Sequence, residues 1–190
     1  MTWIHPWADF VLDRSDGTPV VVVPSALTEP VAVRGMFSQH PTGIAAICAE
    51  VEGVPNGMVV TSLSVGASFE PPFVVFSAQQ TSRTWERLST AARIGVSVLA
   101  EENAESVVRI ASRRGDRFAD TAIARSPDGA VFIVGARLWL DCRPVSQLPL
   151  GDHTLVVLEV VGASSRQGAV PLVYHDGEVV GAGPVIRSRE

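Results

Sequence analysis

The sequence has only two cysteines among its 190 residues, Cys48 and Cys142. They lie far apart in the chain and do not form the closely spaced pairs that bind zinc, so we expect no metal site. Because disulfides are rare in reducing compartments, two isolated cysteines indicate buried thiols of a cytoplasmic protein. Acidic residues outnumber basic ones, and the net charge of −5 argues against a nucleic-acid-binding face.

Long apolar runs and several common motifs are absent as well. The N-terminal MTWIHPWADF has no basic region, so we expect no signal peptide. The apolar run Val20–Val23 is far shorter than the roughly 20 residues of a membrane-spanning helix, so we expect no membrane partner. No GxGxxG, GxxxxGKS/T, HExxH or GxSxG motif occurs. A dinucleotide, if one binds, is therefore not held by a Rossmann fingerprint.

The composition is that of a globular protein. Hydrophobic residues make up 46% of the chain and charged residues 18%, which argues against general disorder. A length of 190 residues favours one domain with a substantial core. Prolines at positions 6, 19 and 24 interrupt the first part of the chain. We therefore interpret residues 1–27 as an N-terminal extension and residues 28–190 as the domain.

Short apolar segments between turn residues predict a mainly β fold. Three short helices are expected, over about 29–39, from a cap at Thr81 or Ser82 to about Ala92, and over 103–112. Residues 115–128 read mostly as loop. Strands are predicted at 44–51, 58–64, 73–77, 94–99, 137–145, 153–163, 171–174 and 178–181.

The connections between these strands indicate the architecture. Glu52-Gly53 and Pro55-Asn56-Gly57 supply the turn before the 58–64 strand, and Asp176-Gly177 forms a hairpin turn near the C-terminus. Because turns rather than helices join most strands, a parallel sheet is disfavoured. We expect an antiparallel closed barrel with two or three short helices, since closure removes exposed edges.

The stretch from Asn56 to Thr84 carries the clearest functional signal. A strand dense with small side chains is followed by a double proline, a second apolar strand and Ser82-Arg83-Thr84 at the start of a helix. Hydroxyl and backbone groups on such a strand can bind the edge of a flat polar ring. The start of a helix beside an arginine favours an anion. A ring site next to a phosphate site predicts a nucleotide-like cofactor, with FMN as the leading candidate.

Seven short motifs, in their order and spacing, resemble the flavin reductase-like family over about residues 36–180. They are Pro41-Thr42-Gly43, Asn56-Gly57-Met58, Glu70-Pro71-Pro72, Ser82-Arg83-Thr84, Gly115-Asp116-Arg117-Phe118, Gly151-Asp152-His153-Thr154 and Pro171-Leu172-Val173-Tyr174-His175. One departure is that the strand after Met58 is about one residue longer before the double proline than in the family.

The resemblance implies a fold and an activity. The fold is an FMN-binding split β-barrel of Greek-key topology. The activity is that of an NAD(P)H-dependent flavin reductase, in which hydride passes from NADH or NADPH to FMN, with FAD as an alternative. Family members are homodimers with the flavin near the interface, and they supply reduced flavin to the separate oxygenase component of a two-component monooxygenase.

The resemblance also implies the site residues. His153 is expected near the flavin and the nicotinamide, where it orients the nicotinamide or donates to the flavin. The expected cofactor-binding residues are Asn56, Gly57, Met58, Val59, Thr61, Ser62, Ser64, Ser82, Arg83, Thr84, Arg117 and Phe118.

Each assignment has a structural alternative. The strand hydroxyls can simply face solvent, Ser82 can only cap its helix, Phe118 can anchor its loop to the core, and His153 can be a hydrogen-bonded histidine at a strand end. Two other functions also remain open. One is an FMN-dependent oxidase or reductase of another small substrate, related to the pyridoxamine-phosphate oxidases. The other is a non-catalytic flavin- or haem-binding module.

Overall fold

The chain divides into two compact units, Met1–Phe37 and Ser38–Glu190. In the first unit, β1 (Val11–Asp13) pairs antiparallel with β2 (Pro19–Val21). The helix predicted over 29–39 is present as α1 (Pro30–Phe37). The computed structural model describes residues 11–13, 19–21, 29–112 and 114–183, with side chains from residue 29 onwards.

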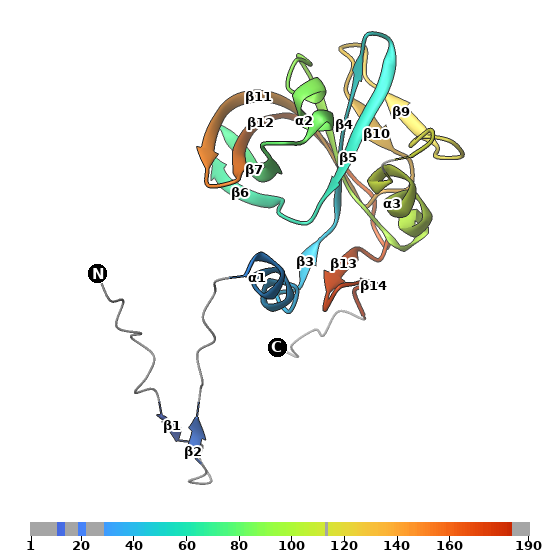
Figure 1. The fold of residues 1–190 in the computed structure, drawn as a ribbon. Coiled ribbons are helices and arrows are strands. Elements are labelled where there is room, and N and C mark those ends of the chain that lie inside the picture. The colour runs from blue at the N-terminus through green and yellow to red at the C-terminus, as the bar shows by residue number, and fades with distance from the viewer. Residues whose placement is uncertain (1–10, 14–18, 22–28, 113, 184–190) are drawn as a thin grey trace. The chain divides into compact units, whose positions relative to one another are not determined.

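The second unit consists mainly of antiparallel β-sheet, which confirms the predicted fold class (Figure 1). Its strands are β3 (Thr42–Gly43), β4 (Ala45–Val51), β5 (Val54–Val60), β6 (Ser64–Phe69), β7 (Pro72–Gln79), β8 (Ile94–Val98), β9 (Ile123–Arg125), β10 (Val131–Ile133), β11 (Leu138–Leu150), β12 (His153–Ser165), β13 (Leu172–His175) and β14 (Glu178–Gly181). Seven of them form one sheet in the order β5-β4-β8-β11-β12-β7-β6. A sheet in the order β14-β13-β3 and the β9–β10 hairpin complete the unit.

The hydrogen bonding of the seven-stranded sheet does not close into a ring, so the prediction of a closed barrel is wrong. β5 and β6 are the two edge strands, although only residues 61–63 separate them in the chain. Because consecutive Cα atoms lie about 3.8 Å apart, the two edges must approach one another at this link. β5 runs on into β6 rather than turning back beside it (Figure 1), so the two form no ladder. This is a split arrangement, as the resemblance implies.

The turn between β4 and β5 is shorter than predicted. It consists of Glu52 and Gly53, whose φ angles of 55° and 77° are the left-handed pair that a two-residue hairpin turn requires. Pro55-Asn56-Gly57, predicted as turn, lies inside β5, and an edge strand tolerates the proline. β5 (Val54–Val60) therefore overlaps the predicted 58–64 strand, but both of its ends lie four residues earlier in the chain. The chain from Ser64 onwards forms β6, which the sequence analysis missed.

A second miss is the β9–β10 hairpin, which lies within and just after the segment expected to be loop. It is attached to the main sheet by a bridge between Ala130 and Ala49. All three residues of β10 are buried. A buried run of three residues shows no alternation, so periodicity does not reveal such a strand.

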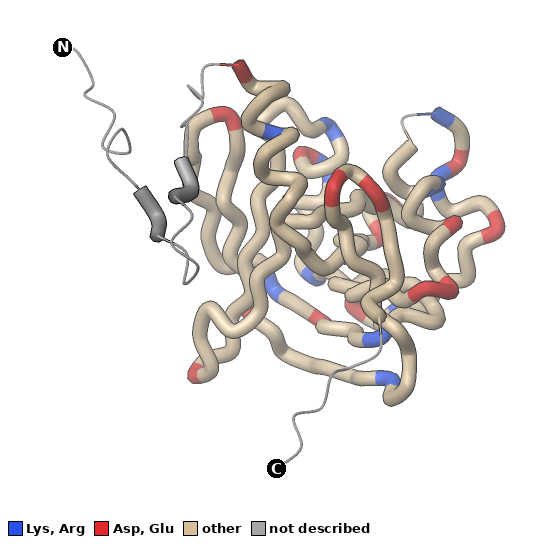
Figure 2. The backbone as a smooth tube through the Cα atoms, turned by 90° about the horizontal axis from the view of Figure 1, so that it is seen from below, with Lys and Arg blue, Asp and Glu red and all other residues tan. Residues whose placement is uncertain are grey.

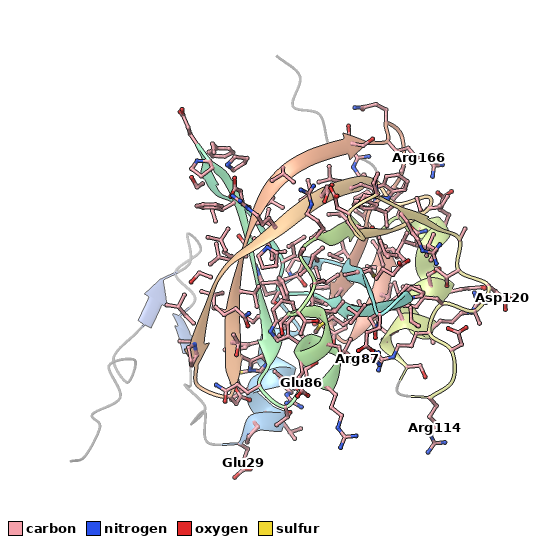
Figure 3. The ribbon with its side chains drawn as sticks, turned by 90° about the horizontal axis from the view of Figure 1, so that it is seen from above. Glu29, Glu86, Arg87, Arg114, Asp120 and Arg166 are labelled. Atoms are coloured by element: carbon pink, nitrogen blue, oxygen red, sulfur yellow. The ribbon has the colours of Figure 1, made fainter. Side chains whose placement is uncertain are left out.

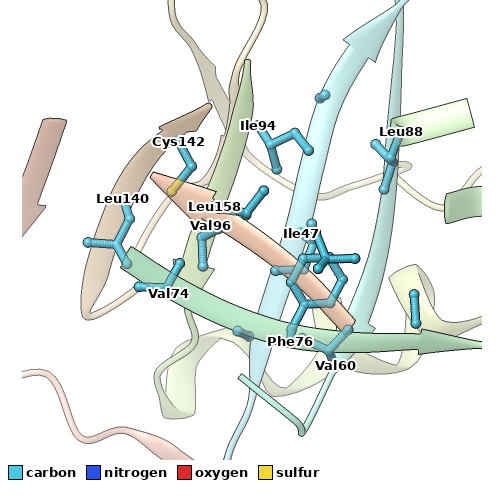
Figure 4. Close-up of a cluster of buried hydrophobic side chains, with 14 of the residues drawn as sticks. Ile47, Val60, Val74, Phe76, Leu88, Ile94, Val96, Leu140, Cys142 and Leu158 are labelled. Atoms are coloured by element: carbon cyan, nitrogen blue, oxygen red, sulfur yellow. The ribbon is translucent and has the colours of Figure 1, made fainter. Parts of the chain in front are cut away.

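β4 is buried on both faces and separates two hydrophobic clusters. Ile47 lies in the first cluster with Phe76 and Leu158, inside the curled sheet (Figure 4). Cys48, the next residue, lies in the second cluster on the other face. The free thiols of Cys48 and Cys142 are both buried, as predicted, and burial raises the pKa of each to about 12.

Three short helical segments lie beside the sheet. α2 (Arg83–Leu88) begins after Ser82, whose Oγ accepts a hydrogen bond from the backbone N–H of Trp85 at 3.2 Å. This confirms the predicted cap, although the helix ends before Ala92. The third predicted helix is present as a 3-10 turn, Glu101–Asn103, followed by α3 (Ala104–Ala111). In the described part of the chain, no helix has the length and apolar character needed to cross a membrane.

Candidate functional site

Three adjoining hollows form one groove along β5, the start of α2 and the start of β12. The inner hollow, of about 370 Å³, is lined by Met58, Val59, Val60, Thr61, Ser62, Ser77, Gln79, Ser82 and His153. The middle hollow, of about 470 Å³, is lined by Gln79, Thr81, Ser82, Arg83, Thr84 and Arg117. The outer hollow, of about 340 Å³, is lined by Pro55, Asn56, Gly57, Arg83, Thr84, Arg87, Gly115, Asp116, Arg117 and Phe118.

Shared residues connect the hollows in series. Gln79 and Ser82 line both the inner and the middle hollow. Arg83, Thr84 and Arg117 line both the middle and the outer hollow. All the predicted site residues line the groove except Ser64, which is exposed at the start of β6 and pairs with Val75 of β7. The structure therefore brings the predicted residues together from segments far apart in the sequence.

Gly57 allows two parts of the molecule to approach β5 closely. It pairs with Cys48 of β4, and a Cβ atom at Gly57 would lie 2.7 Å from Cys48 Sγ and 2.8 Å from Phe118 Cζ. These separations are well below the roughly 3.5–4.0 Å at which nonbonded carbon atoms pack. The Asn-Gly-Met motif thus has a packing reason, since the missing side chain lets the Phe118 loop lie against β5.

Arg117 fastens the loop before β9 to both β5 and α2. Its Nη1 donates to the carbonyl oxygen of Gly57 at 3.0 Å and to Thr84 Oγ1 at 2.8 Å. Thr84 Oγ1 accepts the hydrogen bond from Arg117, and Ser82 Oγ accepts one from the backbone N–H of Trp85. Each hydroxyl therefore keeps its own hydrogen, which it can donate to a ligand. Together with the exposed guanidinium of Arg83, these hydroxyls present donors to the middle hollow.

Phe118 combines two roles that the sequence analysis treated as alternatives. Its ring packs against the second hydrophobic cluster, as an anchor would, and it also lines the outer hollow. The backbone N–H of Phe118 donates to Asp116 Oδ1 at 2.9 Å, which closes a local turn in this loop. The loop is thus held by its own turn, by a buried ring and by Arg117.

Ser62 holds the link between the two edge strands. Its Oγ donates to the carbonyl oxygen of Ser77 at 3.2 Å and accepts from the N–H of Ser77 at 3.0 Å. Because a serine hydroxyl has one hydrogen, none is left for a ligand. Thr61 and Ser62 both line the inner hollow, but the Ser62 hydroxyl is engaged by Ser77.

His153 begins β12 at the inner end of the groove. Its Nδ1 lies 2.7 Å from Asp152 Oδ1, and 35% of its side chain is exposed. A carboxylate beside Nδ1 favours the tautomer with hydrogen on Nδ1, which leaves Nε2 as an acceptor. Gln80 steadies the preceding turn, because its Nε2 donates to the carbonyl oxygens of Gly151 at 3.2 Å and His153 at 3.3 Å.

The outer part of the groove is positively charged, although the chain as a whole is acidic. Arg83, Arg87 and Arg117 line the outer hollow, and Asp116 is the one carboxylate among the described residues that line it. The Arg87 side chain extends outward from α2 (Figure 3). In the rest of the described chain, basic and acidic residues are distributed at intervals along the backbone (Figure 2). A guanidinium can bind phosphate oxygens through two parallel hydrogen bonds, so this charge suits a phosphate ester.

Eight lining residues were not among the predicted site residues: Pro55, Val60, Ser77, Gln79, Thr81, Arg87, Gly115 and Asp116. Arg87 lies four positions after Arg83, a spacing that places both on one face of a helix and that periodicity would have revealed. Ser77 and Gln79 reach the inner hollow because β7 lies beside β12, where Gln79 pairs with His153. That pairing is long-range, and the local sequence carries no signal for it.

Comparison with known proteins identifies the family. The family profile described as flavin reductase like domain matches residues 37–183. The chain is 32% identical over 156 residues to the reductase subunit HsaB of a flavin-dependent monooxygenase from Rhodococcus jostii strain RHA1, covering 82% of this chain and 80% of that protein. It is 30% identical over 150 residues to an NADH:FMN oxidoreductase from Rhodococcus qingshengii, covering 76% of this chain and 78% of that protein.

Comparison with a solved structure shows that the fold is also that of a flavin reductase. The NADH:FAD oxidoreductase SgcE6 of Streptomyces globisporus C-1027, in complex with NAD and FAD fragments, matches with a TM-score of 0.77 and 25% sequence identity. The match covers 84% of this chain and 98% of that one. Fold and groove define an oxidoreductase of the flavin reductase class. The chain belongs to the flavin reductase-like family, as its motifs indicate.

Proposed function

We propose that this protein transfers hydride from NADH or NADPH to FMN or FAD and delivers the reduced flavin to a separate oxygenase. The observation that supports the proposal is the groove, in which an inner hollow bordered by residues 58–62 joins a middle hollow lined by two arginines and by the hydroxyl residues Thr81, Ser82 and Thr84. Such a pair of hollows suits a flat ring connected to a phosphate.

The residues present fit a flavin. Arg83, with the hydroxyls of Ser82 and Thr84, would bind the flavin phosphate in the middle hollow. Residues 58–62 would border the isoalloxazine ring in the inner hollow, where backbone groups can hydrogen-bond its edge without bulk. When bound, flavin supplies the redox chemistry by accepting a hydride from a dihydronicotinamide.

His153 acts in this proposal as a residue that orients the nicotinamide. With hydrogen on Nδ1 toward Asp152, its Nε2 can accept a hydrogen bond from the carboxamide of the nicotinamide. Gln80 supports the turn that carries His153, so the acceptor is held in place. Hydride transfer depends on alignment of the two rings more than on proton movement, and a positioned acceptor serves that alignment.

The proposal includes two partners. The first is a second copy of the chain, and the exposed apolar side chains of Leu148 and Leu150 near the end of β11 support a subunit contact. The second is an oxygenase, because the similar Rhodococcus jostii protein is named as a reductase subunit of a flavin-dependent monooxygenase. Both partners are proposals for this chain.

The direct test is oxidation of NADH and NADPH by the purified protein, with and without added FMN or FAD, after its visible spectrum is recorded. We expect nucleotide oxidation that rises with added flavin. A yellow protein that oxidises neither nucleotide would instead favour a tightly bound flavin in an oxidase or a binding module. A colourless protein that binds no flavin would overturn the proposal.

A further inference from the structure

We propose that the outer hollow binds the adenylate half of FAD, so that FAD rather than FMN is the preferred flavin. This inference rests on the proposed flavin reductase function and names its flavin. The three hollows lie in series, and a flavin phosphate in the middle hollow would lie against Arg83 and Thr84. The same two residues line the outer hollow, which therefore begins where FMN would end.

The volume of the groove favours the longer ligand. The volume of each hollow falls within the range of roughly 300–1,000 Å³ that is typical of small-molecule sites. FMN has one ring system and one phosphate, which correspond to the inner and the middle hollow. FAD continues through a second phosphate to adenosine, and this part corresponds to the outer hollow.

The outer hollow has donors for a second phosphate. Arg83 and Arg117 line both the middle and the outer hollow, and Arg87 joins them on the outer side. The Nη1 of Arg117 is held by Gly57 and Thr84, but a guanidinium carries further N–H groups on Nε and Nη2. A positively charged group that is already fixed in place loses little freedom when it binds an anion.

The same hollow has groups that suit an adenine base. The Nδ2 of Asn56 donates to the carbonyl oxygen of Val54 at 2.9 Å, and this bond orients the amide. Asn56 Oδ1 is then an acceptor that the adenine amino group can use. The anchored ring of Phe118 adds an apolar wall to the hollow, and aromatic contacts bind bases of any kind.

The test measures dissociation constants of FAD, FMN and NADH for the full chain by ligand fluorescence. It compares the unmodified protein, Arg87→Ala and a control, Arg125→Ala. Arg87 and Arg125 are about equally exposed, each faces one glutamate, and Arg125 lines none of the three hollows. We expect FAD to bind at least about tenfold more tightly than FMN, and Arg87→Ala to raise the FAD dissociation constant about five- to tenfold. FMN binding by Arg87→Ala, and both flavins with the control, should be unchanged.

Three outcomes would overturn the inference. The first is equal affinity for FAD and FMN, and the second is an equal effect of Arg87→Ala on both flavins. The third is an effect of Arg87→Ala on NADH binding with FAD binding unchanged, which would place the adenylate of the nicotinamide nucleotide in the outer hollow. Failure of the proposed function would be a distinct result. In the NADH and NADPH oxidation assay, the unmodified protein would then reduce neither flavin.

Discussion

Replacing Gly57 with alanine tests how closely β4, β5 and the Phe118 loop are packed. The added Cβ would lie 2.7 Å from Cys48 Sγ and 2.8 Å from Phe118 Cζ. Cys48 is fully buried and Phe118 only half-buried, so we expect the displacement to fall mainly on Phe118 and its loop. Overpacking of this kind costs ~1–3 kcal/mol, and the lower entropy of the unfolded alanine chain offsets ~0.4–1 kcal/mol. We expect a net loss of about 1–2 kcal/mol in the free energy of unfolding.

Urea unfolding of the purified variants measures this loss. Gly43→Ala is the matched control, because Gly43 also lies in a strand and a Cβ there would meet nothing within 4 Å. Because the same unfolded-chain term applies to Gly43→Ala without a clash, its unfolding free energy should stay the same or rise by up to about 1 kcal/mol. If Gly57→Ala unfolds at the same urea concentration as the control, the close packing inferred at β5 is wrong.

A second variant locates the strain. In a Phe118→Ala background the ring is absent, so Gly57→Ala should cost less than it does in the unmodified protein. Contacting residues typically show coupling energies of about 0.5–3 kcal/mol in such cycles. An undiminished cost would assign the strain to Cys48 and the β4–β5 pairing instead of the loop.

Three further predictions concern the groove and the buried thiols. Arg83→Ala should weaken flavin binding by roughly 1.5–3 kcal/mol, the range for a hydrogen bond to a charged group, as measured by titration; unchanged affinity would remove Arg83 from the phosphate site. His153→Ala should lower kcat about 10–100-fold through misalignment while the flavin Kd changes little, and steady-state kinetics beside flavin titration would separate the two effects. Burial raises the pKa of Cys48 and Cys142 from 9.0 to about 12, so above pH 9 the unfolded chain loses thiol protons that the native state keeps. Stability should therefore fall from about pH 9 to 12, and a Cys48→Ala, Cys142→Ala variant should show a smaller fall in its urea midpoints.

Local chemistry was enough to predict the elements that depend on neighbouring residues. Ser82 caps α2 as its side chain and position indicate, and Asp176-Gly177 forms the turn between β13 and β14 with φ angles of 49° and 85°. The motifs around the groove were also recognisable in the sequence, because each is a short run of residues with its own turn, cap or strand chemistry. From their order alone, the family and its activity could be predicted.

The sequence alone thus determined the mainly β composition, the buried thiols, the helix cap and the family. The tertiary structure decided what depends on contacts between distant segments. Arg117 meets Gly57 and Thr84, Gln79 pairs with His153, and the hydroxyl of Ser62 is taken by Ser77. The same holds for the unclosed sheet, because β5 passes directly into β6 and the two edges find no ladder. Such contacts join residues that lie far apart in the sequence, and local sequence patterns do not encode them. Only the packing of the sheet therefore determines which of these residues face the groove.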